Sequence, residues 1–398
     1  MDCESEHTTP DSRKCTQNDH EELELLTYDT WDGLFGETAE EDISKCHGAF
    51  LGRSLSVPAE FTTLHSPCLE NDFMDDNAYD GDDDSCEDIS DLMDDTTIKD
   101  IIRTKYDIVR ALTPGAEGQV YVCKKIMDLS NNKVVVKAGI KECTTTEAKT
   151  LMKLDHYAIM RVIEVFNNGA ITCLVLPYYR NDLYSFLENR DGPLPFKDAM
   201  VVEKRLLEAL SYIHSKGIFH RDVKSENILL NSPNDACLGD FGAACKINSD
   251  RKPAEYGWAG TAEINSPEML ALDPYCESTD IWSAGIVLFE MLAHRVSLFG
   301  LGDCQNVTGH KQLRRIIKKL QINPAEFPRD KRSRLVRLFI EYADTSRAPY
   351  TVPTWLRKFG FHIDAEYLIT KMLTFDAEYR PSADELLALL MFKHVASQ

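Results

Sequence analysis

Several features that would identify other classes of protein are missing from this chain of 398 residues. No stretch approaches the roughly 20 consecutive apolar residues of a membrane-spanning helix. The opening residues, MDCESEHTTP, have neither the basic head nor the apolar segment of a secretory signal. The twelve cysteines include no C-x-x-C pair, which is typical of reduced thiols in the cytosol or nucleus. We therefore expect no membrane span and no export.

Basic residues are scarce in the first quarter of the chain. Residues 1–98 contain 28 Asp and Glu but four Lys and Arg, a net charge of −24, whereas residues 99–398 contain 37 acids and 40 bases. From Glu70 to Asp95 there are thirteen acids and no base. Such a run repels itself and buries too little apolar surface to offset the entropy of ordering. Residues 1–98 are predicted to be an acidic, mostly disordered leader, and direct binding to nucleic acid is not expected.

The pattern of apolar residues after the leader changes from strands to helices. Strands are predicted at 106–112, 119–123, 133–138, 160–166 and 171–177, with a short helix at roughly 145–154. Longer helices are predicted at 198–215, 278–293, 311–321, 364–373 and 383–392. We predict an α+β, two-lobed fold: a small antiparallel β lobe with one helix at 99–180, and a large helical lobe at 181–398 with an insert at about 295–362.

Two neighbouring motifs carry chemistry. FHRDVKSENILL (219–230) is followed by LGDFGAAC (238–245), with seven residues between them. Asp222 can orient an attacking hydroxyl and accept its proton, and Lys224 can neutralise charge on a transferring phosphoryl group. Asn227 and Asp240 offer the oxygen ligands that Mg²⁺ prefers. Each motif alone is weak, but their joint order and spacing resemble the catalytic and metal-binding loops of a protein kinase.

A lysine and a glutamate complete this resemblance. Lys137 ends the predicted strand KVVVKA, where a kinase holds the nucleotide phosphates. Glu147 is its expected partner on the next helix, in the first turn, with Glu142 as a less suitable alternative. A competing interpretation is that Thr144 and Glu147 form a capping box that serves only the helix. We favour the ion pair.

The loop LTPGAEGQV (112–120) is interpreted as a glycine-rich hairpin over ATP. Its glycines lead into a strand rather than a helix, unlike a dinucleotide fold, and Gly-Lys-Ser/Thr is absent, unlike a Walker loop. Gly115 and Gly118 would let the backbone approach the phosphates, and Thr113 replaces the usual first glycine. The residues expected to bind the nucleotide are Leu112, Thr113, Gly115, Gly118, Val120, Val135, Lys137, Glu147, Leu176, Tyr178 and Leu229.

Further residues match the framework of a kinase large lobe. GTAEINSPE (260–268) resembles the segment that receives the substrate, and Glu268 is expected to form a buried ion pair with Arg380. Asp280 resembles the helix aspartate that holds the backbone of the catalytic loop. Arg221 would await a charged partner on the activation loop. The candidates for that partner are Ser249, Asp250, Glu255 and Tyr256, and the sequence does not decide between a phosphate and a built-in acid.

From about Tyr106 onward the resemblance is closer. TPGAEG, AITCLVLPYYRNDLYSFL, DFGAAC, YGWAGTAEINSPEMLALDPY and INPAEFPRD resemble the serine/threonine kinase encoded in the unique short region of alphaherpesviruses, an avian-virus member in particular. The resemblance implies an ATP- and Mg²⁺-dependent enzyme of the host cytoplasm and nucleus. It also implies phosphorylation of viral egress and nuclear-envelope proteins, inhibition of apoptosis and remodelling of actin.

The same comparison predicts which hydroxyls are phosphorylated. Lys224 together with Thr261 is typical of Ser/Thr kinases rather than Tyr kinases. Asp182, Glu226 and Glu290 stand where arginine-directed kinases present acids to basic peptides. The insert instead resembles the proline-directed group, but the arginine usual before Ala-Pro-Glu in that group is missing. We favour protein substrates with basic residues near Ser or Thr, and a monomeric enzyme.

Two other hypotheses remain. A pseudokinase or adaptor would use the acidic leader to bind partners, and Thr113, Val135 and the short helix favour it. Against it, the lysine Lys137 and the loop residues Asp222, Asn227 and Asp240 are all present. A nucleic-acid mimic has only the charge of the leader in its favour.

Overall fold

The computed structural model describes residues 95–112, 118–127, 132–168, 171–246, 259–294, 296–299, 309–320, 335, 354–393 and 395. The following predictions lie outside the described residues: those on most of the leader, on Thr113 and Gly115, on the four activation-loop candidates between 249 and 256, and on most of the insert. The boundaries predicted at 98, 180, 295 and 362 stay predictions.

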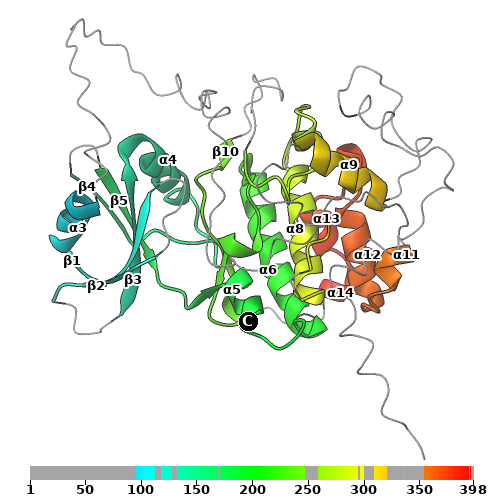
Figure 1. The fold of residues 1–398 in the computed structure, drawn as a ribbon, viewed down its shortest axis with the longest axis horizontal. Helices are drawn as coiled ribbons and strands as arrows, with labels where there is room; N and C mark the ends of the chain where they lie inside the picture. Colours follow the sequence, from blue (N-terminus) through cyan, green and yellow to red (C-terminus); the bar gives the residue numbers. More distant parts are fainter. Residues whose placement is uncertain are drawn as a thin grey trace, which may run out of the picture. The chain divides into compact units, whose positions relative to one another are not determined.

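The small lobe is built on one five-stranded antiparallel sheet with the strand order β1-β2-β3-β5-β4 (Figure 1). The strands are β1 (Tyr106–Ala111), β2 (Gln119–Lys125), β3 (Lys133–Ile140), β4 (Glu164–Asn168) and β5 (Ile171–Pro177). All five strands were predicted, although β4 begins four residues after the predicted start at 160.

Residues of β3 alternate between the two faces of this sheet, as strand geometry requires. Val136 and Ala138 lie in an apolar cluster that also contains Ile98, Ile101 and Ile102 of helix α3 (Asp95–Arg103). Helix α3, which was not predicted, therefore covers one face of the sheet. Its span also crosses the predicted boundary between leader and small lobe.

The opposite face of the sheet is covered by helix α4 (Lys141–Leu151). Ala148 and Leu151 of α4 share the main core with Leu174 of β5. The short helix predicted at 145–154 is present, but it begins at Lys141 and ends at Leu151, so the prediction that Glu147 lies in its first turn is wrong. The capping-box interpretation of Thr144 is also wrong, because a cap residue must lie at the helix start with non-helical backbone, whereas Thr144 lies inside the helix.

The large lobe is mostly helical, as predicted. Its helices are α5 (Leu183–Glu188), α6 (Phe196–Ser215), α7 (Pro267–Leu270), α8 (Ser278–Leu292), α9 (Gly309–Leu320), α11 (Thr354–Arg357), α12 (Ile363–Met372), α13 (Ala383–Leu387) and α14 (Leu390–Lys393). Short strands and 3₁₀ turns join them: β6 (Asn181–Asp182), β7 (Ile218–Phe219), η1 (Ser225–Asn227), β8 (Ile228–Leu230), η2 (Pro233–Asp235), β9 (Cys237–Leu238), β10 (Cys245–Lys246) and η5 (Ala377–Tyr379). The single helix predicted at 383–392 is wrong, because α13 ends at Leu387 and α14 begins at Leu390.

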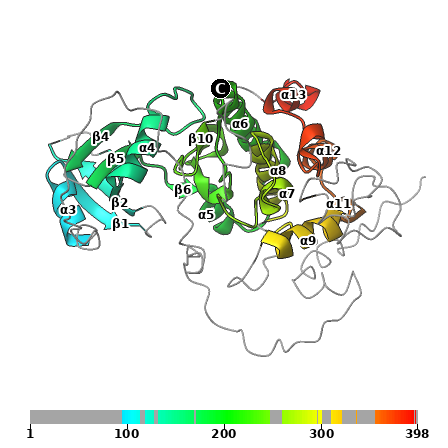
Figure 2. The same ribbon diagram turned by 90° about the horizontal axis from the view of Figure 1, so that it is seen from above.

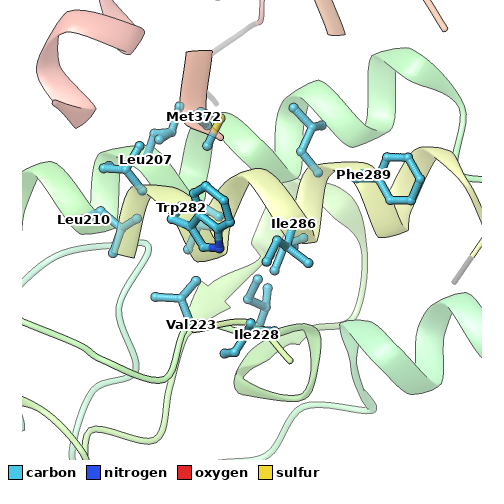
Figure 3. Packing of buried hydrophobic residues seen from close by; sticks show 14 of the residues in the cluster. Leu207, Leu210, Val223, Ile228, Trp282, Ile286, Phe289 and Met372 are labelled. Atoms are coloured by element: carbon cyan, nitrogen blue, oxygen red, sulfur yellow. The ribbon is translucent and has the colours of Figure 1, made fainter. Parts of the chain in front are cut away.

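The core of the large lobe lies where α6 packs on α8 (Figure 2). Leu207 and Leu210 of α6 lie beside Trp282 of α8, and Met372 of α12 belongs to the same cluster (Figure 3). The Trp282 side chain is fully buried, so burial of apolar area holds this helix pair together. Within the described part of the chain no helix is long and apolar enough to cross a membrane.

Candidate active site

One buried carboxylate of α8, that of Asp280, holds the backbone of the catalytic loop at His220 and Arg221. Asp280 accepts hydrogen bonds from the backbone N–H of His220 (2.8 Å) and of Arg221 (2.8 Å), and its Oδ2 lies 2.8 Å from Nε2 of His214. Burial alone would raise the pKa of Asp280, but the His214 hydrogen bond and the neighbouring histidine and backbone donors outweigh it and lower the pKa. Asp280 is therefore ionised in a fully buried position.

Two residues of the site have strained backbone. Arg221 (φ 68°) and Asp240 (φ 53°) lie in the left-handed region, which costs a non-glycine residue on the order of 1–3 kcal/mol. Asp280 stabilises the strained peptide at Arg221 through the two backbone hydrogen bonds. Such strain places the residues that follow, Asp222 and Phe241, in positions that relaxed backbone would not give them.

Asp222 is the centre of a network of polar side chains. Its Oδ2 is 2.8 Å from Lys224 Nζ and accepts a bond from Asn227 Nδ2 at 3.0 Å, and its Oδ1 accepts a bond from the Thr261 hydroxyl at 3.0 Å. Lys224 also donates to the Thr261 oxygen at 3.0 Å. The predicted catalytic residues and the predicted substrate residue Thr261 thus meet around one carboxylate.

Lys224 remains a cation in this network. Desolvation would lower its pKa, but the charge and hydrogen bond of Asp222 raise it. Gly260, one residue before Thr261, has φ +70°, and a Cβ there would lie 2.2 Å from the Arg221 carbonyl oxygen. Only glycine lets the substrate segment approach the catalytic loop this closely.

Lys137 connects the small lobe to the DFG loop. Its Nζ lies 2.7 Å from Glu147 Oε2 and 3.0 Å from Asp240 Oδ1. Glu147 is buried, with a side chain 1% exposed, whereas that of Asp240 is 47% exposed. Desolvation would raise the pKa of Asp240, but the charge and the hydrogen bond of Lys137 outweigh it and lower the pKa. The expected ion pair between Lys137 and Glu147 is present.

Asn227 and Asp240 present oxygen donors from adjacent chain segments. Gly239, next to Asp240, donates its backbone N–H to the Asn227 carbonyl at 2.8 Å. Asn227 turns its amide nitrogen toward Asp222, so its side-chain oxygen is left to accept. An amide oxygen and a carboxylate at this point are the hard ligands that a divalent cation such as Mg²⁺ takes.

Two residues of the predicted nucleotide site, Val120 and Leu176, lie on the two strands that pair with β3. Val120 pairs with Lys137 across strands, and Val135 pairs with Leu176. Leu112, Tyr178 and Leu229 are half-buried, as are Val120, Val135 and Leu176. A partly covered apolar surface next to a cation is suited to a flat ring that bears phosphates.

Gly118 has a structural role besides the predicted approach of its backbone to the phosphates. Its φ is +149°, and a Cβ there would lie 2.3 Å from the Ala138 carbonyl oxygen of β3. The start of β2 can therefore reach β3 only with glycine at this position.

The substrate segment is tied to the large lobe by the expected buried ion pair. Arg380 Nη1 lies 2.8 Å from Glu268 Oε1 and its Nη2 3.2 Å from Oε2, a bidentate contact. The same guanidinium donates to the backbone carbonyls of Ser278 and Thr374. Because both charges are buried, removing either one leaves the other without compensation.

The three acids predicted to bind a basic peptide differ in their surroundings. Ser225 places its hydroxyl 3.0 Å from Glu290 Oε2 and 3.4 Å from Glu226 Oε2, which brings these two acids together. Desolvation, with the charge of Glu226, raises the pKa of Glu290 to about 8. Asp182 instead caps α5, accepting bonds from the Ser185 N–H at 2.7 Å and its hydroxyl at 2.8 Å.

Two residues of the site were missed from the sequence. His214 lies within the helix predicted at 198–215 and Ser225 within FHRDVKSENILL, but neither was given a role in the site. For His214 the only signal in the sequence was its closeness to His220. Its hydrogen-bond partner, Asp280, is 66 residues away along the chain. The capping role of Asp182 could have been found, because an aspartate before a helical segment is a standard N-cap signal.

Comparison with known proteins agrees with this geometry. Residues 106–392 match the protein kinase domain. The chain is 48% identical over 294 residues to the "Protein kinase US3 homolog" of Gallid herpesvirus 2, which covers 73% of this chain and 72% of the relative. It is 46% identical over 291 residues to the "Serine/threonine-protein kinase US3 homolog" of Equine herpesvirus 1 (72% and 75% covered). It is 45% identical over 300 residues to "Serine/threonine-protein kinase US3" of Human herpesvirus 1 (72% and 60% covered).

Proposed function

The chain belongs to the protein kinase family and, within it, to the US3-type serine/threonine kinases of alphaherpesviruses, and on that premise we propose that Asp222 is the centre of its phosphoryl transfer. Its two-lobed α+β fold is that of the family. The avian source stays a prediction, because this chain is almost equally similar to the relative from the avian virus (48% identical) and to that from the equine virus (46% identical).

The geometry around Asp222 supports a role for each neighbour. The carboxylate orients the target Ser or Thr hydroxyl and accepts its proton, while Lys224 (2.8 Å away) offsets the charge of the transferred phosphoryl group. Thr261 holds both groups in place through its hydroxyl. Lys137, held at 2.7 Å by Glu147, anchors the phosphates of ATP. This network is the observation that carries the proposal.

ATP and Mg²⁺ are the proposed cofactors. Asn227 and Asp240 would hold the metal ion, because both present oxygen atoms beside the catalytic loop, and the lowered pKa of Asp240 keeps its carboxylate ionised. The bound ion would neutralise charge on the phosphates. Lys137 and Glu147 align the nucleotide, and the half-buried apolar residues of β2, β3 and β5 cover its base.

We also propose that the enzyme prefers Ser or Thr with arginine nearby. The pairing of Glu226 with Glu290 at Ser225 places two acids at one point of the catalytic-loop surface, and a guanidinium there would form charge-assisted hydrogen bonds with both. Asp182 is the weaker candidate, because both of its oxygens already cap α5. A monomeric enzyme in the host cytoplasm and nucleus, with roles in viral egress, apoptosis and the cytoskeleton, is proposed from family resemblance.

The test is phosphate transfer from labelled ATP with Mg²⁺ to three matched peptides. The first has arginines before the serine, the second has alanines in their place, and the third has proline after the serine. The full chain is compared with Asp222→Ala and with the control Asp155→Ala, an exposed aspartate far from the loop in sequence. We expect the wild-type chain to transfer phosphate to the arginine peptide. The rate of transfer should fall at least about 10³-fold in Asp222→Ala and should not fall in Asp155→Ala.

The alternative outcomes separate the parts of the proposal. A preference for the proline peptide would retain the kinase and reject the arginine preference. Equal loss of activity in both variants would reject the role of Asp222. A folded chain that binds ATP but transfers phosphate to no peptide would favour the pseudokinase or adaptor hypothesis.

A further inference from the structure

Helix α8 holds the substrate segment as well as the catalytic loop. Besides the bonds that Asp280 accepts from the loop, Ser283 donates its hydroxyl to the Ile264 carbonyl oxygen at 2.9 Å. The Thr279 hydroxyl lies 2.8 Å from that of Ser266, and both hydroxyls are buried. The chain is thus attached to α8 on both sides of position 265, so the backbone of this residue is fixed relative to the catalytic loop.

The residue at this position, Asn265, is 1% exposed. Its Nδ2 donates to the Ala259 carbonyl oxygen at 2.9 Å, and its backbone N–H donates to the Thr261 carbonyl oxygen at 3.1 Å. A carbonyl oxygen only accepts, so the nitrogen of the amide has to face Ala259. We call these two bonds, which hold the chain on both sides of Gly260, the Asn265 clamp.

Gly260 lies between the clamp and the catalytic aspartate. A Cβ at Gly260 would lie 3.1 Å from Asn265 Oδ1 and 3.3 Å from Asp222 Oδ1. The amide of the clamp and the carboxylate of the catalytic loop therefore border the same glycine. Because packing here leaves no room even for a methyl group, a displacement of the turn 259–261 changes its distance from Asp222 directly.

Thr261 connects the clamp to the groups proposed to react. Its carbonyl accepts the backbone bond from Asn265, and its hydroxyl lies 3.0 Å from Asp222 Oδ1 and 3.0 Å from Lys224 Nζ. A hydrogen bond weakens steeply as its distance and angle depart from the ideal. The Thr261 hydroxyl can thus bond both groups only while the backbone on either side of it stays in place.

We propose that Asn265 is a positioning residue for phosphoryl transfer, whose side-chain amide holds the turn 259–261 so that the Thr261 hydroxyl stays between Asp222 and Lys224. The inference rests on the roles proposed above for those three residues. Asn265 itself touches neither ATP nor peptide in this scheme. Its loss should therefore lower kcat while KM for ATP is retained, because the clamp acts on the groups around the target hydroxyl.

The experiment is steady-state kinetics of the full chain with labelled ATP, Mg²⁺ and the arginine peptide. Asn265→Leu keeps a side chain of similar size without a donor, and Asn265→Ala removes the amide without any risk of overpacking. We expect kcat to fall at least about tenfold in both, since displacements of about 1 Å at a catalytic group have effects of this order or larger. KM for ATP should stay within about twofold.

Asn189→Leu is the matched control. The Asn189 amide also donates to a backbone carbonyl, that of Ser185 at 2.8 Å, at the end of α5. The same substitution there removes the same kind of bond and should leave kcat within about twofold. Thermal melts of every variant establish that it is folded at the assay temperature.

A double-mutant cycle with Thr261 separates positioning from a general structural role. If Asn265 acts through the Thr261 hydroxyl, adding Asn265→Leu to Thr261→Ala should lower kcat by less than about twofold beyond Thr261→Ala alone. In Thr261→Ser, which retains the hydroxyl, Asn265→Leu should again lower kcat at least about fivefold.

The remaining outcomes decide against the inference in distinguishable ways. If both Asn265 variants keep the kcat of wild type while Asp222→Ala loses it, the positioning role is rejected and the proposed function is retained. Losses that multiply in the double variant, or an equal loss in Asn189→Leu, would assign Asn265 a merely structural role. If the wild-type chain transfers no phosphate, the proposed function and this inference both fail.

Discussion

Asp280 on α8 and Glu203 on α6 are both fully buried carboxylates, on two helices that pack together in the large lobe. Asp280 faces two backbone N–H groups and His214, and its pKa is lowered. Among the residues that the structure describes, neither carboxylate oxygen of Glu203 has a hydrogen-bond partner, and desolvation raises its pKa well above the usual value. For these two buried acids, the hydrogen-bond donors around the carboxylate decide whether its pKa is lowered or raised.

The difference also separates two uses of a buried acid. The ionised Asp280 holds the strained backbone of Arg221, one residue before Asp222, so its charge serves the reaction. Desolvation raises the pKa of Glu203 and favours its neutral form, and the carboxyl places a polar group in an apolar core, which costs stability. The contrast predicts opposite consequences when each carboxylate is replaced.

Replacing Asp280 should have the largest effect. In Asp280→Asn the side chain keeps one acceptor oxygen, so one of the two backbone donors loses its partner and the loop relaxes. We expect kcat for the arginine peptide to fall about 10²-fold or more, because displacement of a catalytic group by about 1 Å costs that much. Steady-state kinetics of the full chain measure the loss.

Asp155→Asn makes the same chemical change at an exposed position and should leave kcat within about twofold. Thermal unfolding of Asp280→Asn should show a lower midpoint than the wild type, since a buried donor left unsatisfied costs about 1–3 kcal/mol. Unchanged kcat in Asp280→Asn would remove the role assigned to this carboxylate.

Replacing Glu203 should stabilise the protein. In Glu203→Leu the unpaired carboxyl is exchanged for an apolar group, and we expect a gain of about 1–3 kcal/mol in the free energy of unfolding. The folded-state pKa of Glu203 is raised, so the stability it contributes is present below about pH 4.5 and is lost as pH rises through the folded pKa. The advantage of the variant should therefore be larger at pH 8 than at pH 5.

Denaturant unfolding at both pH values measures this prediction, with Glu208→Leu as the control. Glu208 stands on the same helix but its carboxylate is paired with the Tyr157 hydroxyl, so its replacement should not stabilise. A Glu203→Leu protein less stable than wild type at pH 8 would show that the carboxyl has a partner in solution.

Glu290 lies between these extremes and should show the smallest effect. Desolvation and the charge of Glu226 raise the pKa of Glu290 to about 8, although the hydrogen bond from Ser225 opposes this shift. Since binding of an arginine favours the ionised form, we expect KM for the arginine peptide to fall about three- to tenfold from pH 6.5 to 8.5. In Glu290→Gln the KM should stay within about twofold over that range.

The alanine peptide supplies the control for this pH dependence, because it offers no guanidinium to the acid pair. Its KM should change with pH equally in wild type and Glu290→Gln. A slope for the arginine peptide that survives unchanged in the variant would assign the titration to another group.

Much of the fold and of the candidate site was predictable. The five strands, the long helices and the ion pair of Lys137 with Glu147 follow from local periodicity and from motif spacing. Helix α3 was missed because its three isoleucines lie next to an acidic run that indicated disorder. The start of α4 was misplaced because a threonine run resembles a cap, whereas packing of Ala148 and Leu151 against the sheet extends the helix.

The sequence by itself determined which groups are available for phosphoryl transfer, because the lysine, the aspartates and the asparagine stand in motifs whose spacing is set along one chain. The tertiary structure decided the charge of each acid. The resemblance to kinases singled out Asp280, but local sequence alone does not separate it from Glu203, because each is a carboxylate within an apolar helix. Asp280 meets the backbone donors of His220 and Arg221, in the loop after β7, and the ring of His214 on α6. Glu203 has no hydrogen-bond partner among the described residues, and the pKa of a buried group depends on such distant partners.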